Sequence, residues 1–310
     1  MQLPAHMLWL SRGWLNANQL LLTGGDGPAL IDTGHIGSTD ETFHLLQTHG
    51  VAASELKAFV NTHSHLDHFG GNHAIRRHTQ APLLCSPLTA QFFADNDHHS
   101  MWLLDYERRN WPLLNERPVQ ANETLHAGER VELGTYRFEV VPIPGHAPDM
   151  IALFQPETKV LVCADAMVFQ DSTVMNTLVW PDAIEQAIDS LERLRSLKAS
   201  IALPGHGPIL TDVEGNINTV ITLLRKFQEQ PEKHRRHTFS RAMMFLLLVE
   251  LPLPREQIEV IMVESELIQN FADFLSVPPQ ALVTNTLDSF LARGSLVQDN
   301  DGLLRTTIAA

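Results

Sequence analysis

The feature that most constrains this chain is the segment HSHLDH at residues 63–68, which places four metal-ligand side chains within six positions. His63 and His65 are two residues apart, so both can point to one side at the end of a strand. Asp67 and His68 follow as the chain turns. Imidazole nitrogens and carboxylate oxygens suit Zn²⁺, and Fe or Mn also accept them. Because four ligands exceed what one open catalytic ion needs from one loop, we expect two divalent metal ions, with Zn²⁺ favoured.

Three further ligand-type residues each follow an apolar, strand-like run. His146 lies in PIPGHAPD, Asp165 in LVCADAM and His206 in ALPGHGP. A rigid sheet can present such side chains from the loops at its edge. If Asp165 bridges, each ion receives four protein ligands and a hydroxide can be shared between the ions. The candidate metal ligands are therefore His63, His65, Asp67, His68, His146, Asp165 and His206.

The first 210 residues alternate short apolar runs with helix-like stretches, which indicates an α/β domain that we place at 1–230. LKAFVNTH is expected to be a strand that delivers the histidine segment at its carboxyl end. Gly70 and Gly71 would then let the chain turn sharply. WPDAIEQAIDSLERLRSL is expected to be an amphipathic helix. Residues 86–120 read as a helical insert whose aromatic side chains, with the C-terminal helices, would wall an apolar pocket.

The pattern changes after about residue 230. PEKHRRH at 231–237 reads as an exposed, charged connector, and helical stretches follow near 239–250, 255–276 and 278–293. GSLVQDNDGLLRTT reads as a small β-hairpin. Helices with a terminal hairpin indicate a smaller, mostly helical and winged-helix-like C-terminal domain at 231–310.

The charge and hydropathy of the chain limit which binding partners are expected. The net charge of −14 argues against nucleic acid or an anionic membrane, because either would be reached through a basic patch. Residues 231–310 hold seven Lys/Arg against ten Asp/Glu, which favours a packing, lid or homodimer-forming element over a nucleic-acid reader. The chain shows no export-signal pattern and no apolar run of about 18 residues. We therefore expect a soluble, cytoplasmic protein with a small-molecule substrate and no membrane contact.

The segment HSHLDH, followed by the histidine of PIPGHAPD, the aspartate of LVCADAM and the histidine of ALPGHGP, resembles the motif series of the metallo-β-lactamase fold superfamily. Asp32, in ALIDTG, matches an early aspartate of that family. The resemblance covers roughly residues 5–215 and implies an αββα sandwich with the site at one edge. It also implies two ligand sets that share a bridging Asp165: His63, His65 and His146 for the first ion, and Asp67, His68 and His206 for the second.

The chemistry that this site implies is hydrolysis. A metal-bound water has its pKa lowered to about 7, so a hydroxide that bridges two ions can attack a carbonyl at neutral pH. We expect the substrate to be a small or medium-sized ester, thioester or lactone. Asp67 is expected to orient the nucleophile as the catalytic residue, and Asp32 to brace the ligand loop.

Several related functions stay open. The motif set resembles those of glyoxalase II and of lactonases, but AMVFQDSTVMNT replaces the glycine-rich, arginine-bearing stretch that follows the bridging aspartate in glyoxalase II. Val168 stands where lactonases usually place a tyrosine, and His65 replaces the glutamate of flavodiiron-type members. The alternatives are a mononuclear iron oxygenase such as a sulfur dioxygenase, a phosphodiesterase or β-lactamase, and a non-catalytic regulatory relative.

Overall fold

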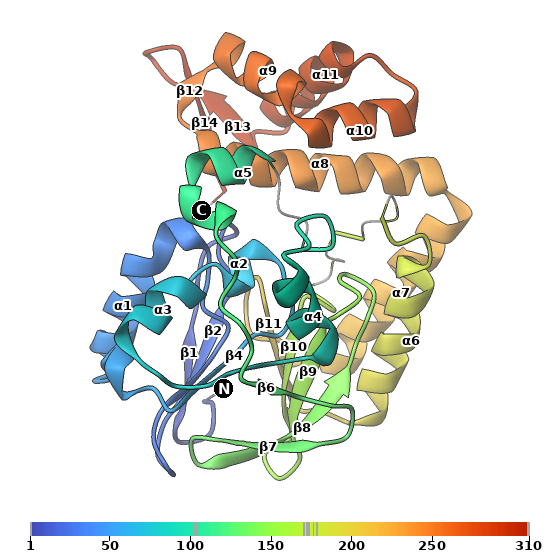
Figure 1. The fold of residues 1–310 in the computed structure, drawn as a ribbon. Coiled ribbons are helices and arrows are strands. Elements are labelled where there is room, and N and C mark those ends of the chain that lie inside the picture. Colours follow the sequence, from blue (N-terminus) through green and yellow to red (C-terminus); the bar gives the residue numbers. More distant parts are fainter. Residues whose placement is uncertain are drawn as a thin grey trace.

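Two β-sheets face each other in the first two thirds of the chain, and helices cover the outer face of each sheet (Figure 1). The computed structural model describes residues 2–101, 105–169, 171, 174–175, 177 and 179–308. This layering confirms the αββα sandwich that the ligand motifs implied.

The first sheet has six strands in the order β1-β2-β3-β4-β5-β6. Its strands are β1 (Met7–Leu10), β2 (Gln19–Leu22), β3 (Ala29–Ile31), β4 (Ala58–Val60), β5 (Leu83–Cys85) and β6 (Glu123–Thr124). The strands from β1 to β3 pair antiparallel, whereas those from β3 to β6 run parallel. Because parallel strands end at the same edge of a sheet, the loops after β3 and β4 lie next to each other.

The second sheet has five strands in the order β11-β10-β9-β8-β7. Its strands are β7 (Arg130–Leu133), β8 (Tyr136–Pro142), β9 (Ile151–Gln155), β10 (Val160–Ala164) and β11 (Ile201–Pro204). Only the pair β10 and β11 is parallel among these neighbours. The loops after β10 and β11 therefore also share one edge.

The layer between the sheets is a closed apolar core. Leu22 on β2, Leu153 on β9 and Leu203 on β11 are fully buried there. All five residues of β9 are buried, because this strand is covered by the other sheet on one face and by helices on the other. Burying each such leucine contributes about 1.5–3 kcal/mol relative to an exposed position. The sheets thus form a rigid support for the loops at their edge.

The outer faces are covered by amphipathic helices. α1 (Thr39–Thr48) and α3 (Asn72–His78) flank the first sheet, and α6 (Ala183–Ser196) and α7 (Val213–Glu229) flank the second (Figure 1). On α6 the side chains of Ile184, Leu191 and Leu194 are buried at helical spacing. The amphipathic helix predicted in this segment is confirmed.

The insert predicted to be helical at 86–120 contains short pieces. They are α4 (Pro87–Asp95), α5 (Asp105–Asn110) and a 3₁₀ turn at Pro112–Asn115. Three other short elements lie earlier in the chain: α2 (Leu66–Phe69) and the 3₁₀ turns Ile36–Ser38 and Ala53–Glu55. Phe92 and Phe93 are buried in the core beneath α4, where Phe93 packs against Phe69. Trp102 and the side chain of Tyr106 lie outside the described part of the chain.

The C-terminal part forms a separate apolar cluster of helices with a small sheet. Its elements are α8 (Pro231–Glu250), β12 (Leu253–Pro254), α9 (Arg255–Glu264), α10 (Glu266–Leu275), α11 (Pro279–Ala292), β13 (Leu296–Gln298) and β14 (Leu303–Thr306). β13 and β14 form the predicted hairpin, and β12 adds a third strand. None of the helices in the described residues is both long and apolar enough to cross a bilayer.

The charged segment 231–237 is not a connector, contrary to the prediction. It forms the first turns of α8, in which Pro231 occupies the first helical turn, a position that tolerates proline. His234 is buried and its ring packs 5.1 Å from that of Phe227. The run looked like a linker because most of its charged side chains lie on the exposed side of the helix.

Candidate metal centre

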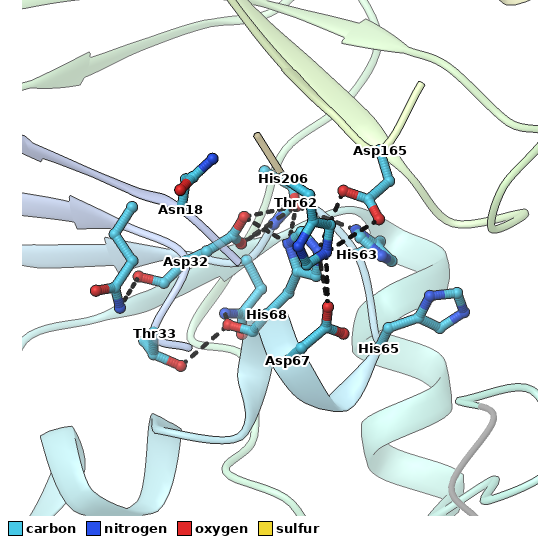
Figure 2. Close-up of polar contacts among 12 residues, drawn as sticks. Asn18, Asp32, Thr33, Thr62, His63, His65, Asp67, His68, Asp165 and His206 are labelled. Atoms are coloured by element: carbon cyan, nitrogen blue, oxygen red, sulfur yellow. Dashed lines mark hydrogen bonds and ion pairs between the residues drawn. The ribbon is translucent and has the colours of Figure 1, made fainter. Parts of the chain in front are cut away.

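The seven candidate ligands meet at one edge of the two sheets. The segment after β4 supplies four of them, and the loops after β8, β10 and β11 supply His146, Asp165 and His206. Figure 2 shows the labelled imidazoles of His63 and His68 with the Asp165 carboxylate beside them. All seven side chains are buried except for that of His65, which is partly exposed.

The first group consists of His63, His65 and His146, whose ligand atoms lie within 4.8 Å of one another. Nδ1 of His146 donates to the carbonyl of Val174 at 2.7 Å, so its Nε2 presents a lone pair. That Nε2 lies 2.8 Å from Nδ1 of His65. The buried Nε2 of His63 has no hydrogen-bond partner among the described residues. Imidazole nitrogens whose lone pairs face one another in a buried site repel each other unless a proton or a cation lies between them.

The second group consists of Asp67, His68 and His206, again with ligand atoms within 4.8 Å. Nε2 of His206 lies 2.9 Å from Oδ2 of Asp67. Asp165 lies between the two groups: its Oδ1 is 3.4 Å from Nε2 of His68, and its Oδ2 is 3.4 Å from Nε2 of His146. The predicted ligands are therefore brought together, with Asp165 between the two groups.

Asp32, which belongs to neither ligand group, holds the ligand segment through hydrogen bonds. Its Oδ2 lies 2.8 Å from Nδ1 of His68, and its Oδ1 accepts from the backbone N–H of Thr62 at 2.8 Å (Figure 2). The hydroxyl of Thr62 also donates to Oδ2 of Asp32 at 2.9 Å. A hydrogen bond to one ring nitrogen of a histidine sets which nitrogen is left for a metal. Asp32 thus turns Nε2 of His68 toward the cluster, as predicted for a bracing residue.

Several glycines near the site lie so close to neighbouring atoms that a Cβ would not fit. A Cβ on Gly205 would overlap Oδ1 of Asp165 and lie 2.9 Å from Cε1 of His68. Gly70 and Gly71 were predicted to permit a sharp turn, but their φ angles of −57° and −77° are ordinary for any residue. The Cβ atoms that these two glycines lack would instead overlap the backbone between Thr33 and Ile36.

Burial and neighbouring charge set the protonation of the cluster. Burial lowers the pKa of the His63 and His146 imidazoles, and it lowers the pKa of His65 to about 3. Burial alone would raise the pKa of Asp67, but the imidazoles of His68 and His206 hold that pKa below its usual value. Burial alone would lower the pKa of His68 and His206 as well, but the carboxylates around these two imidazoles raise both pKa values above the usual one. The first group therefore has neutral imidazoles, whereas a cation in the second group would take the place of protons. Imidazoles beside ionised carboxylates are the donor set of a borderline divalent ion, so the residues fit two such ions.

A cavity of about 310 Å³ opens from the metal-ligand cluster toward the C-terminal helices. Its wall includes Met244, Phe245 and Leu248 of α8 and Leu267 of α10. The prediction that C-terminal helices wall an apolar pocket is therefore correct, but the aromatic residues of the insert do not line it among the described side chains. Among the described side chains of the insert, Glu107 lines the wall.

Three positions near the site were missed at the sequence level. The side chain of Asn18 donates to the carbonyls of Pro204 and Gly207, which holds the loop that carries His206. The ring of Trp14 stacks on that of His206 at 5.7 Å. Arg241 of α8 lies 5.9 Å above the Trp14 ring and pairs with Asp171. No local sequence pattern links these three residues to the candidate ligands. The only hint was the segment WLNANQ at 14–19, whose polar residues lead into β2.

The fold and the ligand cluster agree with what comparisons of this chain with known proteins show. The model of a family described as "Metallo-beta-lactamase superfamily" matches residues 12–206, so the chain belongs to this superfamily. The metallo-beta-lactamase family protein TTHA1429 of Thermus thermophilus has the same fold, with a TM-score of 0.60. That likeness covers 97% of this chain and 98% of the other at 20% sequence identity.

Two curated relatives match a smaller share of this chain and of their own length. The "Beta-lactamase-like protein 2 homolog" of Caenorhabditis elegans is 23% identical over 207 residues, 66% of this chain and 60% of that protein. A "Hydroxyacylglutathione hydrolase" of Thermosynechococcus vestitus is 29% identical over 149 residues, 46% of this chain and 45% of that protein. The chain thus spans about half of the length of these relatives.

Proposed function

We propose that this protein is a dinuclear metal-dependent hydrolase of an ester, thioester or lactone. The observation that supports this most is the place of Asp165 between two groups of buried ligands. A relative named as a hydrolase of hydroxyacylglutathione, a thioester, supports acyl transfer to water. The pocket beside the ligands supports a small or medium-sized substrate.

Each ligand has a defined part in this proposal. The first ion would be held by the group of His63, His65 and His146 and the second by that of Asp67, His68 and His206, and Asp165 would serve both. The ions, which we propose to be Zn²⁺, would lower the pKa of a bound water and polarise the substrate carbonyl. Asp67 accepts a hydrogen bond from the attacking water and orients it. Asp32 keeps His68 in the ring orientation that the second group needs.

Elemental analysis combined with a chromogenic panel of esters, thioesters, lactones and phosphodiesters tests the proposal. We expect about two zinc ions per chain, one for each ligand group, and hydrolysis of at least one carbonyl substrate class. Asp67→Asn and His146→Ala should each lower kcat/KM by more than about 100-fold. The matched control is His49→Ala, which removes an exposed imidazole at the end of α1 and should leave the rate unchanged.

The alternatives give different results in the same experiment. One iron per chain with oxygen consumption would identify a mononuclear oxygenase. Hydrolysis of phosphodiesters or β-lactams alone would replace the proposed substrate class. A protein that binds two ions but hydrolyses nothing in the panel would be a non-catalytic relative.

A further inference from the structure

Helix α8 has two apolar sides. On one side Met243, Leu246 and Leu247 are buried in the core of the C-terminal helices. On another side Met244 and Leu248, which are four residues apart, line the cavity beside the ligand cluster. Residues at this spacing lie on one face of a helix. We call the residues Met244, Phe245 and Leu248 the apolar stripe of α8.

Packing within the chain accounts for only part of the apolar stripe. Leu248 is buried and Met244 also packs at the edge of the C-terminal core, yet all three side chains line the cavity. A helix at a protein surface ordinarily has one apolar face, toward the core, and a polar face toward solvent. Met244 and Phe245 are only partly buried by the protein itself. Apolar surface that faces an open cavity lacks the burial that stabilises a core, so an apolar ligand would gain free energy by covering it.

The cavity connects the apolar stripe to the metal-ligand cluster without interruption. His65, His146 and Asp165 form one end of its wall, and Leu267 of α10 adds to the apolar end. A substrate can therefore place a carbonyl at the ligands and an apolar group along α8 at the same time. The volume of about 310 Å³ lies at the lower end of the range for small-molecule sites.

The charges in the wall disfavour a highly anionic substrate. Arg241 is the one Lys or Arg among the described residues that line the cavity, and it already pairs with Asp171. Glu107, which is not a proposed ligand, adds a carboxylate to the same wall. The pair of Arg241 with Asp171 also joins α8 to the loop that follows Asp165, so it positions the stripe relative to the ligands.

We propose that the substrate has an apolar acyl group of medium length, which lies along the apolar stripe of α8 while its carbonyl lies at the metal-ligand cluster. This inference rests on the proposed hydrolase function. It makes the C-terminal helices the element that selects the acyl group. Hydrolysis breaks the bond between the acyl carbon and the leaving oxygen or sulfur, water supplies the new oxygen, and the products are a carboxylic acid and an alcohol or thiol.

A series of thioesters and esters from acetyl to dodecanoyl tests the inference on the metal-loaded protein. We expect kcat/KM for the octanoyl substrate to exceed that for the acetyl substrate by at least about tenfold. Met244→Trp fills the apolar part of the cavity and should lower this octanoyl-to-acetyl ratio of kcat/KM by about tenfold. Met244→Ala enlarges the same part and should move the optimum to longer chains.

Val260→Trp is the matched control, because it adds the same side chain to α9 at an exposed position outside the cavity wall. It should keep the wild-type chain-length profile. An unchanged ratio in both Met244 variants, with folding verified by circular dichroism, would overturn the inference while leaving the hydrolase function intact.

Calorimetric binding of octanoate and acetate to the metal-free protein separates the two proposals. Tighter binding of octanoate, weakened by Met244→Trp but not by Val260→Trp, supports the apolar site even if no substrate in the series is hydrolysed. In that case the hydrolase proposal fails alone. Equal binding of octanoate and acetate to the wild-type protein counts against the apolar site.

Discussion

Oδ2 of Asp32 lies 2.8 Å from Nδ1 of His68, which joins the loop after β3 to the ligand segment after β4. The same carboxylate accepts from the backbone and the hydroxyl of Thr62. Asp32 is itself held at a φ angle of +59°, a left-handed conformation that aspartate and asparagine adopt more readily than most residues other than glycine. The orientation of one metal-ligand imidazole thus depends on a residue that does not belong to either ligand group.

Asp32→Asn should weaken metal binding without unfolding the protein. An asparagine amide that donates toward Nδ1 of His68 would reverse the hydrogen bond and turn the ring away from its present orientation. We expect the affinity for the second ion to fall by about 10–100-fold, measured by competition with a chromophoric chelator. The control is Asp40→Asn, the same change at an exposed position on α1. Equal affinities in both variants would contradict the bracing role.

Gly205→Ala should reduce the number of bound ions. The added Cβ would overlap Oδ1 of Asp165, so the carboxylate must move from between the two ligand groups. We expect elemental analysis to find fewer than two ions per chain. Gly207→Ala is a control in the same loop, because its φ of +80° brings strain but its Cβ would have open space. That control should lower stability by about 1 kcal/mol and keep the metal content; full metal content in Gly205→Ala would be evidence against the bridging place of Asp165.

Metal removal should lower the melting temperature. Asp67 and Asp165 are buried carboxylates whose mutual repulsion a cation relieves, and an ion that binds only the folded chain stabilises it. At a free metal concentration of 100 times Kd the gain is about 2.7 kcal/mol per site. We expect zinc addition to the stripped protein to raise Tm by roughly 5–10 °C in differential scanning calorimetry. The shift should shrink in His146→Ala, and no shift in the wild-type protein would argue that the cluster binds no ion.

His234 should make stability depend on pH. Burial, together with nearby His237 and Arg235, lowers the pKa of His234 from 6.5 to about 4. Between these values the unfolded chain binds a proton that the folded chain does not. This contribution to stability is therefore complete above pH 6.5 and is lost as the pH falls toward 4.

Urea unfolding of metal-free protein at about pH 7 and about pH 4.5 measures this effect. His234→Gln keeps a hydrogen-bonding group near Thr238, which lies 3.1 Å from Nε2 of His234. The variant should lose about 1–2 kcal/mol less than the wild-type protein between the two conditions. His126→Gln, at an exposed position, should retain the wild-type pH dependence. Identical losses in His234→Gln and wild type would show that His234 does not contribute.

Local sequence patterns predicted where the candidate ligands lie for a clear physical reason, whereas the sandwich was implied by the resemblance to the superfamily. A ligand that follows an apolar strand must lie at a sheet edge, as Asp165 does after β10 and His206 after β11. The same kind of pattern failed for residues 231–237, because a helix with one buried residue among charged ones has the composition of a linker. In the insert at 86–120 the expected aromatic wall is not met by Phe92 and Phe93, which pack inward instead of toward the cavity.

What the sequence alone determined was the set of candidate ligand side chains and the strands that present them, since both depend on spacing within a few residues. Only the tertiary structure decided which distant atoms meet: the contact of Asp32 with His68, the close approach of Gly205 to Asp165, and the side of α8 that faces the cavity. The physical reason is that α8 is apolar on more than one side. Periodicity therefore could not tell its core side from the stripe of Met244, Phe245 and Leu248, and only the tertiary structure shows which of these side chains line the cavity.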